Sequence, residues 1–288
     1  MSAVVRDPAR ERELREAGFT VVRLLSGQAA ARLRDELLAL SPAGALRASV
    51  AGRHDHACHA TFLEPDEAYR RAACAAVEAR LGPPLAALLT GYRRLLAGFV
   101  VKPAGAGEVG LHRDWTMTAD PAELALNVWC PLVDVDADNG ALALVPGSHR
   151  IAPGTIEGPG GRCRWAAELG DPPPPARPVA LRAGEALLYD SRTLHRSSPN
   201  LSGAARPVAT ATYIPEDARP AFFRFTSATG PTRAERYDMA GDAHLAHSAA
   251  DYHGGIVRAP MATVEADAPA PPRRGLAGAV RALLRRGG

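Results

Sequence analysis

Residues 126–150 read LNVWCPLVDVDADNGALALVPGSHR, in which two apolar runs of β type are separated by Asp, Asn and Gly. Similar runs occur before and after this stretch, at residues 93–103, 179–190, 206–215 and 221–226. Many short strands divided by turn residues are typical of a sandwich or a jelly roll. We therefore predict a mainly β fold from Tyr92 onward.

The first third of the chain has a different pattern and is predicted to be mainly helical. The expected elements are a helix from the N-cap Asp7 to the C-cap Gly18, a strand at 19–25, a helix after the N-cap Ser26, and an alanine-rich helix at 66–81 that ends at the Gly-Pro-Pro of 82–84. Helices therefore precede the β part of the chain.

Length and composition predict one globular domain. The 288 residues are 47% hydrophobic and 23% charged, with a net charge of +3 that is spread along the chain, which argues against a nucleic-acid footprint. No apolar run is long enough for a membrane span, and the N-terminus is too charged for a secretory signal, so we expect a cytoplasmic protein. The four cysteines lack the spacing of a zinc ribbon or a disulfide framework.

One segment within this domain, placed at residues 1–264, and one segment after it are expected to differ from the core. Residues 151–178 are rich in Gly and Pro and suggest a lid beside a functional site. Residues 265–288 form an Ala/Pro linker and a basic tail, for which a solvated tail and an amphipathic helix are the two interpretations.

A His-x-Asp pair predicts a metal site. His112 and Asp114 are two residues apart, so on a strand their side chains point the same way. His195 follows in the segment GEALLYDSRTLHRSSPN at 184–200. Two histidines and one carboxylate on one face of a metal leave coordination positions open, as in non-haem Fe(II) oxygenases. The pattern therefore indicates oxidative chemistry.

Three segments together carry a resemblance to a known family. LHRDWT at 111–116, the stretch 126–150 and GEALLYDSRTLHRSSPNLSGAARP at 184–207 resemble the phytanoyl-CoA dioxygenase (PhyH) family of Fe(II)/2-oxoglutarate-dependent oxygenases. The resemblance covers residues 18–215. It implies a double-stranded β-helix, a jelly-roll fold, with N-terminal helices packed on one sheet, in agreement with the elements predicted above.

The resemblance also implies site residues and a reaction. His112, Asp114 and His195 would be the iron ligands, Arg206 would pair with the distal carboxylate of 2-oxoglutarate, and Ser197 would be a further cosubstrate contact. Oxidative decarboxylation with O₂ would give succinate and CO₂ and hydroxylate a C–H bond of a small molecule. Desaturation, cyclisation or epimerisation by the same machinery, and a non-catalytic binding module, are the alternatives. The intact carboxylate argues against halogenation.

Other candidate cosubstrate contacts come from position along the strands. Asn127 and Trp129, two apart on one strand, are expected to face the interior and line the cosubstrate pocket, although Trp129 can equally be core. Lys102, the only lysine of the chain, is expected to reach a carboxylate of the cosubstrate or substrate. The alternative is that a lysine occurs at this position by chance. Related oxygenases carry Arg-x-Ser where this chain has Arg206-Pro207-Val208, so a hydroxyl partner is sought among Ser197, Thr210 and Thr212.

Several remaining groups have a functional and a plain interpretation. His149 resembles a fourth ligand, but a surface histidine capping the PGSHR turn explains it better. The cluster at residues 54–59 resembles a second metal site, but a loop near the site's mouth fits better. Arg113, Arg219 and Arg224 are candidates for an anionic substrate group, with solvated surface charge as the alternative. The substrate itself is expected to be a small organic molecule, with a biosynthetic intermediate as the leading guess.

Overall fold

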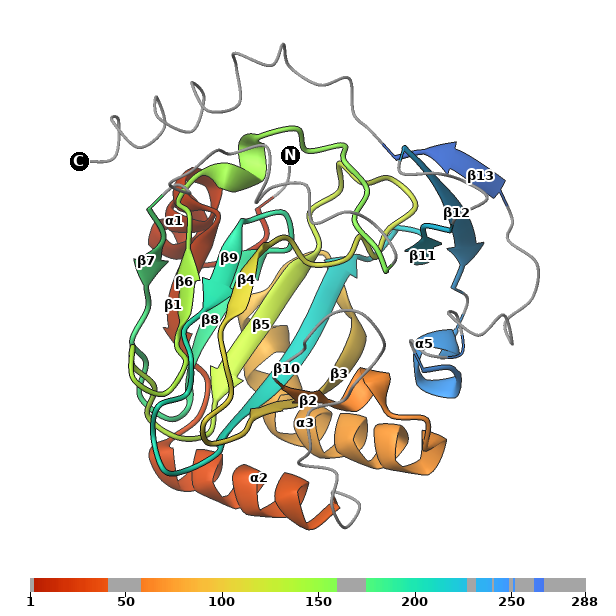
Figure 1. Ribbon diagram of the computed structural model, residues 1–288. Helices are drawn as coiled ribbons and strands as arrows, with labels where there is room; N and C mark the ends of the chain where they lie inside the picture. The colour runs from red at the N-terminus through yellow and green to blue at the C-terminus, as the bar shows by residue number, and fades with distance from the viewer. Residues whose placement is uncertain are drawn as a thin grey trace.

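The computed structural model describes residues 3–40, 58–159, 175–226, 232–239, 241–248, 251 and 262–266. Two antiparallel sheets face each other (Figure 1). The larger sheet has the order β1 (Phe19–Arg23), β8 (Glu185–Asp190), β5 (Leu126–Pro131), β10 (Arg206–Pro215), β3 (Tyr92–Lys102) and β2 (His59–Ala60). The smaller sheet has the order β4 (Val109–His112), β9 (His195–Ser197), β6 (Leu142–Leu144) and β7 (Arg177–Pro178). The predicted double-stranded β-helix is confirmed.

Side-chain alternation along β5 gives the large sheet two different faces. Leu126, Val128 and Cys130 belong to the main core, where the sheet packs against the helices. Trp129, which points the other way, belongs to a cluster with Tyr189 between the two sheets. The helices therefore cover the outer face of the large sheet (Figure 1), and the inner face is left for the site.

The helices begin largely where the sequence predicts. In α1 (Pro8–Ala17), the Asp7 side chain accepts from the first-turn amides and Gly18 adopts a left-handed conformation with φ 88°. In α2 (Gly27–Leu40), the Ser26 hydroxyl accepts from the amide of Ala29 at 3.2 Å. Both caps are confirmed.

The third helix is longer than predicted. α3 (Glu67–Leu88) continues through Pro83 and Pro84, so the expected end at residue 81 is wrong. Two prolines remove two N–H donors, but Leu81 and Leu85 are fully buried in the main core on one side of the helix, while Pro83 is exposed on another. Tertiary packing thus outweighs the local helix-breaking signal.

The C-terminal part adds a small third sheet beside the sandwich. It consists of β11 (Ala221–Arg224), β12 (Arg233–Asp238) and β13 (Ala262–Glu265), with the short helix α5 (Ala243–Ala246) nearby (Figure 1). The Ala266 amide donates to Thr232 at 2.8 Å, and its side chain is buried, so the packed part extends two residues beyond the expected boundary at 264.

Some expectations lie outside the described residues. These are the central part of the expected lid at 160–174, the histidines at 54 and 56, Cys163 and the basic tail from residue 267. Among the described cysteines, Cys74 and Cys130 are buried free thiols, whereas Cys58 is only partly buried. The helices of the described part are too short or too polar to cross a membrane.

Candidate active site

Three ligand atoms converge between the two sheets. The Asp114 Oδ1 atom lies 3.9 Å from His112 Nε2 and 3.6 Å from His195 Nε2, and the three ligand atoms lie within 4.8 Å of one another. β4 and β9 are neighbours in the small sheet, with His112 paired to His195. Asp114 lies beyond the end of β4 rather than on the expected strand, with its amide bonded to Ser191 O at 3.1 Å.

Both histidines are oriented for metal binding by backbone carbonyls. His112 Nδ1 lies 2.8 Å from Gly110 O, and His195 Nδ1 lies 2.9 Å from Thr193 O. A carbonyl can only accept, so each Nδ1 carries the proton and each Nε2 presents its lone pair. The donor set of two imidazoles and one carboxylate suits a divalent transition metal such as Fe(II).

The carboxylate is held through its second oxygen. Asp114 Oδ2 accepts from Asn127 Nδ2 at 2.7 Å and from the Tyr189 hydroxyl at 2.8 Å. Thr212 in turn donates to Asn127 Oδ1 at 2.7 Å, which fixes the orientation of the amide. Burial, followed by the Asp114 charge, raises the pKa of Tyr189 well above its ordinary value, so the phenol stays a donor. Oδ1 therefore remains available to a metal.

A buried cationic group lies in the same cavity. Arg206 is 3% exposed, with one guanidinium nitrogen on Gly140 O at 2.6 Å and the guanidinium carbon 5.0 Å from the centre of the Trp129 ring. Its Nε atom is buried and has no hydrogen-bond partner among the described residues. A buried donor without a partner is costly, so the position suits an acceptor from a bound ligand.

Lys102 lies directly opposite Arg206 in the register of β3 and β10. It is fully buried, and its ammonium group donates to the Ser197 hydroxyl at 2.9 Å and to the carbonyl of Ser198. Burial, opposed by Cys58 and reinforced by Arg206, lowers the pKa of Lys102 to about 8. Burial likewise lowers the pKa of Arg206 to about 10. Two neighbouring cations in an apolar setting favour an anionic ligand.

One cavity of about 250 Å³ contains these groups. All eight predicted site residues except Lys102 line it, and Lys102 contacts it through Ser197. Thr210, the remaining hydroxyl candidate, also lines it, with its hydroxyl 3.4 Å from Gly98 O. Tyr189 is the functional residue that the sequence analysis missed. Its role can be recognised only from the strand pairing, because Tyr189 lies opposite Asn127 in the register of β8 and β5.

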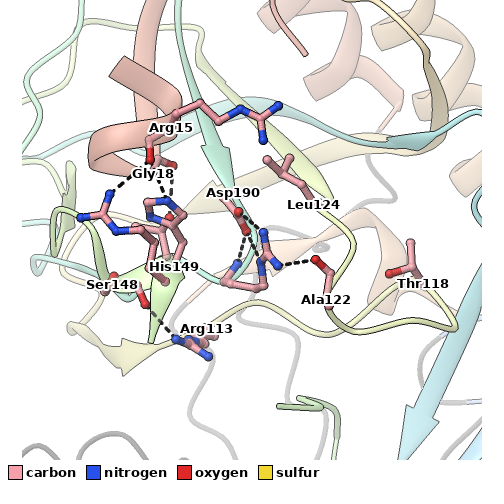
Figure 2. Close-up of polar contacts among 12 residues, drawn as sticks. Arg15, Gly18, Arg113, Thr118, Ala122, Leu124, Ser148, His149 and Asp190 are labelled. Atoms are coloured by element: carbon pink, nitrogen blue, oxygen red, sulfur yellow. Dashed lines mark hydrogen bonds and ion pairs between the residues drawn. The ribbon is translucent and has the colours of Figure 1, made fainter. Parts of the chain in front are cut away.

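The PGSHR turn connects the two ligand-bearing segments. Arg113 stands between the first two ligands in the sequence and is buried. It donates to Ser148 O at 2.9 Å and to the carbonyl of Ile151. The Ser148 hydroxyl accepts from the amide of Leu194, the residue before His195, at 2.8 Å. Figure 2 shows Arg113 directed at Ser148. Arg113 is thus a structural residue, and the surface-charge interpretation is wrong for it.

The same turn is attached to the end of α1 (Figure 2). His149 Nε2 lies 3.2 Å from Arg15 O, and a Cβ atom at Gly18 would meet the His149 ring at 2.5 Å. His149 is buried rather than on the surface, and burial lowers its pKa to about 4. It lies outside the three-residue metal cluster, so it is a packing residue of this contact.

The structure also places the other residues for which the sequence left two interpretations. Cys58 and Ala60 line the cavity, whereas His59 points away and bonds to the Tyr69 hydroxyl at 2.8 Å. Residues 54–57 of this cluster lie outside the described residues, so the expected loop at the site's mouth stays a prediction. Arg224 pairs with Glu235 at 2.7 Å, and Arg219 is exposed.

Comparisons with known proteins agree with this geometry. The family model described as Phytanoyl-CoA dioxygenase (PhyH) matches residues 14–208. Two curated relatives, the phytanoyl-CoA dioxygenase domain-containing protein 1 of Bos taurus and that of Danio rerio, are 28% and 31% identical over 116 residues, or 38% of this chain. The match spans 40% of the length of each of these relatives.

Solved structures share the fold. The non-heme alpha-ketoglutarate-dependent carbocyclase SnoK from nogalamycin biosynthesis is 20% identical, with a TM-score of 0.53 over 89% of this chain and 93% of its own. HygX from Streptomyces hygroscopicus, with nickel, 2-oxoglutarate and hygromycin B bound, is 16% identical, with a TM-score of 0.51 over 73% and 88%. Since the family model matches more than half of its residues, the chain belongs to the phytanoyl-CoA dioxygenase family.

Proposed function

We propose that this protein is an oxidoreductase, an Fe(II)/2-oxoglutarate-dependent dioxygenase that hydroxylates an unactivated C–H bond of a small organic molecule. O₂ is consumed, and succinate and CO₂ are released. The observation that carries the proposal is one cavity that contains both a converging His-Asp-His set and a buried arginine with an unpartnered Nε atom. Membership of the PhyH family supports it.

His112, Asp114 and His195 would hold the iron. The two histidines present their Nε2 lone pairs, and Asp114 supplies the one anionic donor, with its second oxygen held by Asn127 and Tyr189. Three protein ligands leave positions open for a cosubstrate and O₂. Bound Fe(II) supplies the activation of O₂, driven by oxidative decarboxylation of 2-oxoglutarate.

Arg206 would bind the distal carboxylate of 2-oxoglutarate. Trp129 orients its guanidinium group, and Gly140 O occupies one nitrogen, which leaves Nε for the carboxylate. Lys102 donates to the Ser197 oxygen, so the Ser197 proton is free to point at the cosubstrate. Asn127 would act on the cosubstrate indirectly, because its amide is already bonded to Asp114 and Thr212.

The reactions of related enzymes suggest alternatives to hydroxylation. SnoK is a carbocyclase and SnoN, 21% identical with a TM-score of 0.52, is an epimerase, both from nogalamycin biosynthesis. Cyclisation, epimerisation or desaturation is therefore the alternative to hydroxylation, and a biosynthetic intermediate is the substrate that we favour. The complete ligand set and Arg206 support an enzyme over a non-catalytic binding module.

The test is an anaerobic titration of the metal-free protein with Fe(II) and 2-oxoglutarate, monitored by the visible charge-transfer band of the chelated complex. We expect the band in the wild type, its loss in His112→Ala, and a steep rise in the 2-oxoglutarate requirement in Arg206→Ala with iron binding retained. Folded wild-type protein that binds iron but shows no band would reject the proposal. Succinate release then provides a screen for substrates.

A further inference from the structure

The cavity lining contains two chemically different groups. The first is the polar group of Arg206 and Ser197 with Trp129, described above. The second is apolar and includes Phe62, Leu63, Leu96, Trp115 and Met117. The two groups pack in separate clusters, because Leu63 packs with Trp115 whereas Trp129 packs between the sheets with Tyr189. The cavity thus offers an apolar wall apart from the cosubstrate residues.

The charged side chains that line the cavity in the described part of the chain already have partners or assigned roles. His112, Asp114 and His195 form the metal set, and Arg206 serves the cosubstrate. Arg113 donates to the carbonyls of the 148–152 turn. An ionised substrate group that entered this cavity would lose water without gaining an opposite charge from the described residues, which is strongly unfavourable.

Two aromatic rings shape the apolar wall. Phe62 and Trp115 meet edge to face, with ring centroids 5.8 Å apart and planes at 79°. Trp115 also meets Phe222 of β11 edge to face, with ring centroids 6.0 Å apart and planes at 85°. Phe62 is 36% exposed, and Trp115 beside it is partly buried. A preformed aromatic surface that is left partly open fits a ligand that covers it.

We propose that the part of the substrate that enters the cavity is uncharged, apolar and flat, such as a fused aromatic ring system, and lies against Phe62 and Trp115. This inference rests on the dioxygenase function proposed above. Since the cavity of about 250 Å³ must also hold the cosubstrate, only the reacting end of a larger substrate enters it. Charged or heavily hydroxylated parts of the substrate remain outside.

The test uses two probes of the same ring size that differ in charge, 2-methoxynaphthalene and 2-naphthoate. Each is titrated by calorimetry into the full chain loaded with 2-oxoglutarate and Ni(II), which permits binding without turnover. We expect the neutral probe to bind at least about tenfold more tightly than the anion. Phe62→Ala should lower the affinity for the neutral probe by about tenfold. Leu201→Ala, at an apolar side chain that is 75% exposed and is not part of the cavity lining, should leave it unchanged.

A charge reversal provides a gain of function. Phe62→Arg should favour 2-naphthoate over the neutral probe. The inference is overturned if 2-naphthoate binds the wild type as tightly as the neutral probe, if neither probe binds, or if neither Phe62→Ala nor Trp115→Ala weakens the neutral probe. Repeating the neutral titration on metal-free protein separates the two proposals. Binding there through Phe62, without a charge-transfer band in the Fe(II) titration, would keep the apolar site and reject the dioxygenase.

Discussion

At the scale of single residues, the Asp114 carboxylate shows how side chains outside the metal set prepare it. One oxygen faces the histidines, and the other accepts two hydrogen bonds, from Asn127 and Tyr189. These bonds limit rotation of the carboxylate and so hold Oδ1 in place before a metal arrives. The His-x-Asp pair was predictable from spacing, whereas Tyr189 was not, because its contact depends on the pairing of β8 with β5.

Removing the Tyr189 hydroxyl should weaken metal binding. We expect Tyr189→Phe to lower Fe(II) affinity by about tenfold, within the range for partners of metal ligands. Anaerobic titration with Fe(II) measures this affinity. Tyr92→Phe is the matched control, because that hydroxyl donates to Leu124 O, away from the site. Equal iron affinities in Tyr189→Phe and the wild type would show that Tyr189 does not position Asp114.

Lys102 should make cosubstrate binding depend on pH. With its pKa lowered to about 8, Lys102 is charged at pH 7 and neutral at pH 9. Its attraction for a dicarboxylate is therefore present at pH 7 and lost as the pH rises through 8. We expect 2-oxoglutarate affinity to fall by about tenfold across this interval, the effect of one nearby charge. Lys102→Met should bind more weakly at pH 7 and show a flatter profile. A parallel decline in both proteins would exclude Lys102.

At the scale of elements, the 145–152 turn couples three parts of the fold. It bonds to Arg113 beside the first two ligands, to Leu194 beside the third, and to the last turn of α1 through Gly147, whose amide donates to Ala17 O at 2.7 Å. The PGSHR motif predicts a turn here, but the residues that bond to it lie about 35 to 130 positions away in the sequence. That the turn links the ligand-bearing segments to α1 is therefore apparent only in the folded chain. Similarly, the continuation of α3 through Pro83 depends on core packing.

Breaking this connection should affect stability and metal binding together. Arg113→Met leaves the buried carbonyl of Ile151 without its donor, at about 1 to 3 kcal/mol for an unsatisfied group, whereas the carbonyl of Ser148 keeps the amide of Ile151. We expect a lower melting temperature and weaker Fe(II) binding in protein that still folds. Arg219→Met, at an exposed arginine, is the matched control. If Arg113→Met loses stability but keeps wild-type metal affinity, the turn supports the fold without positioning the ligands.

At the scale of the whole molecule, the site depends on segments that are distant in the chain. The segment 58–63, which contains β2, and strands β5, β8 and β10 each contribute to one cavity. Strand patterning was enough to predict the sandwich, and the His-x-Asp spacing a metal site, whereas Arg206 followed from the family resemblance and its cosubstrate role stays a prediction. The cavity's apolar wall was not predictable, because Phe62 and Trp115 meet only after β2 pairs with β3 and the C-terminal sheet supplies Phe222.

The basic tail should be dispensable for the proposed chemistry. The described packing ends at Ala266, whose amide and carbonyl bond to Thr232 and Ile156. We expect a chain that ends at residue 266 to keep the melting temperature, Fe(II) affinity and 2-oxoglutarate affinity of the full chain. Calorimetry and the charge-transfer titration measure these quantities. Truncation at residue 261, which removes β13, is the comparison and should destabilise the protein.

The burial of Lys102 also gives the molecule a built-in chemical reporter. It is the only lysine of the chain and has no solvent exposure, so amine-reactive reagents meet only the N-terminal amine while the native state persists. Acylation of Lys102 requires the strands around Arg206 to separate. The rate of its labelling, read by mass spectrometry after peptide digestion, therefore measures how often the cosubstrate end of the barrel opens, and a bound dicarboxylate should slow it.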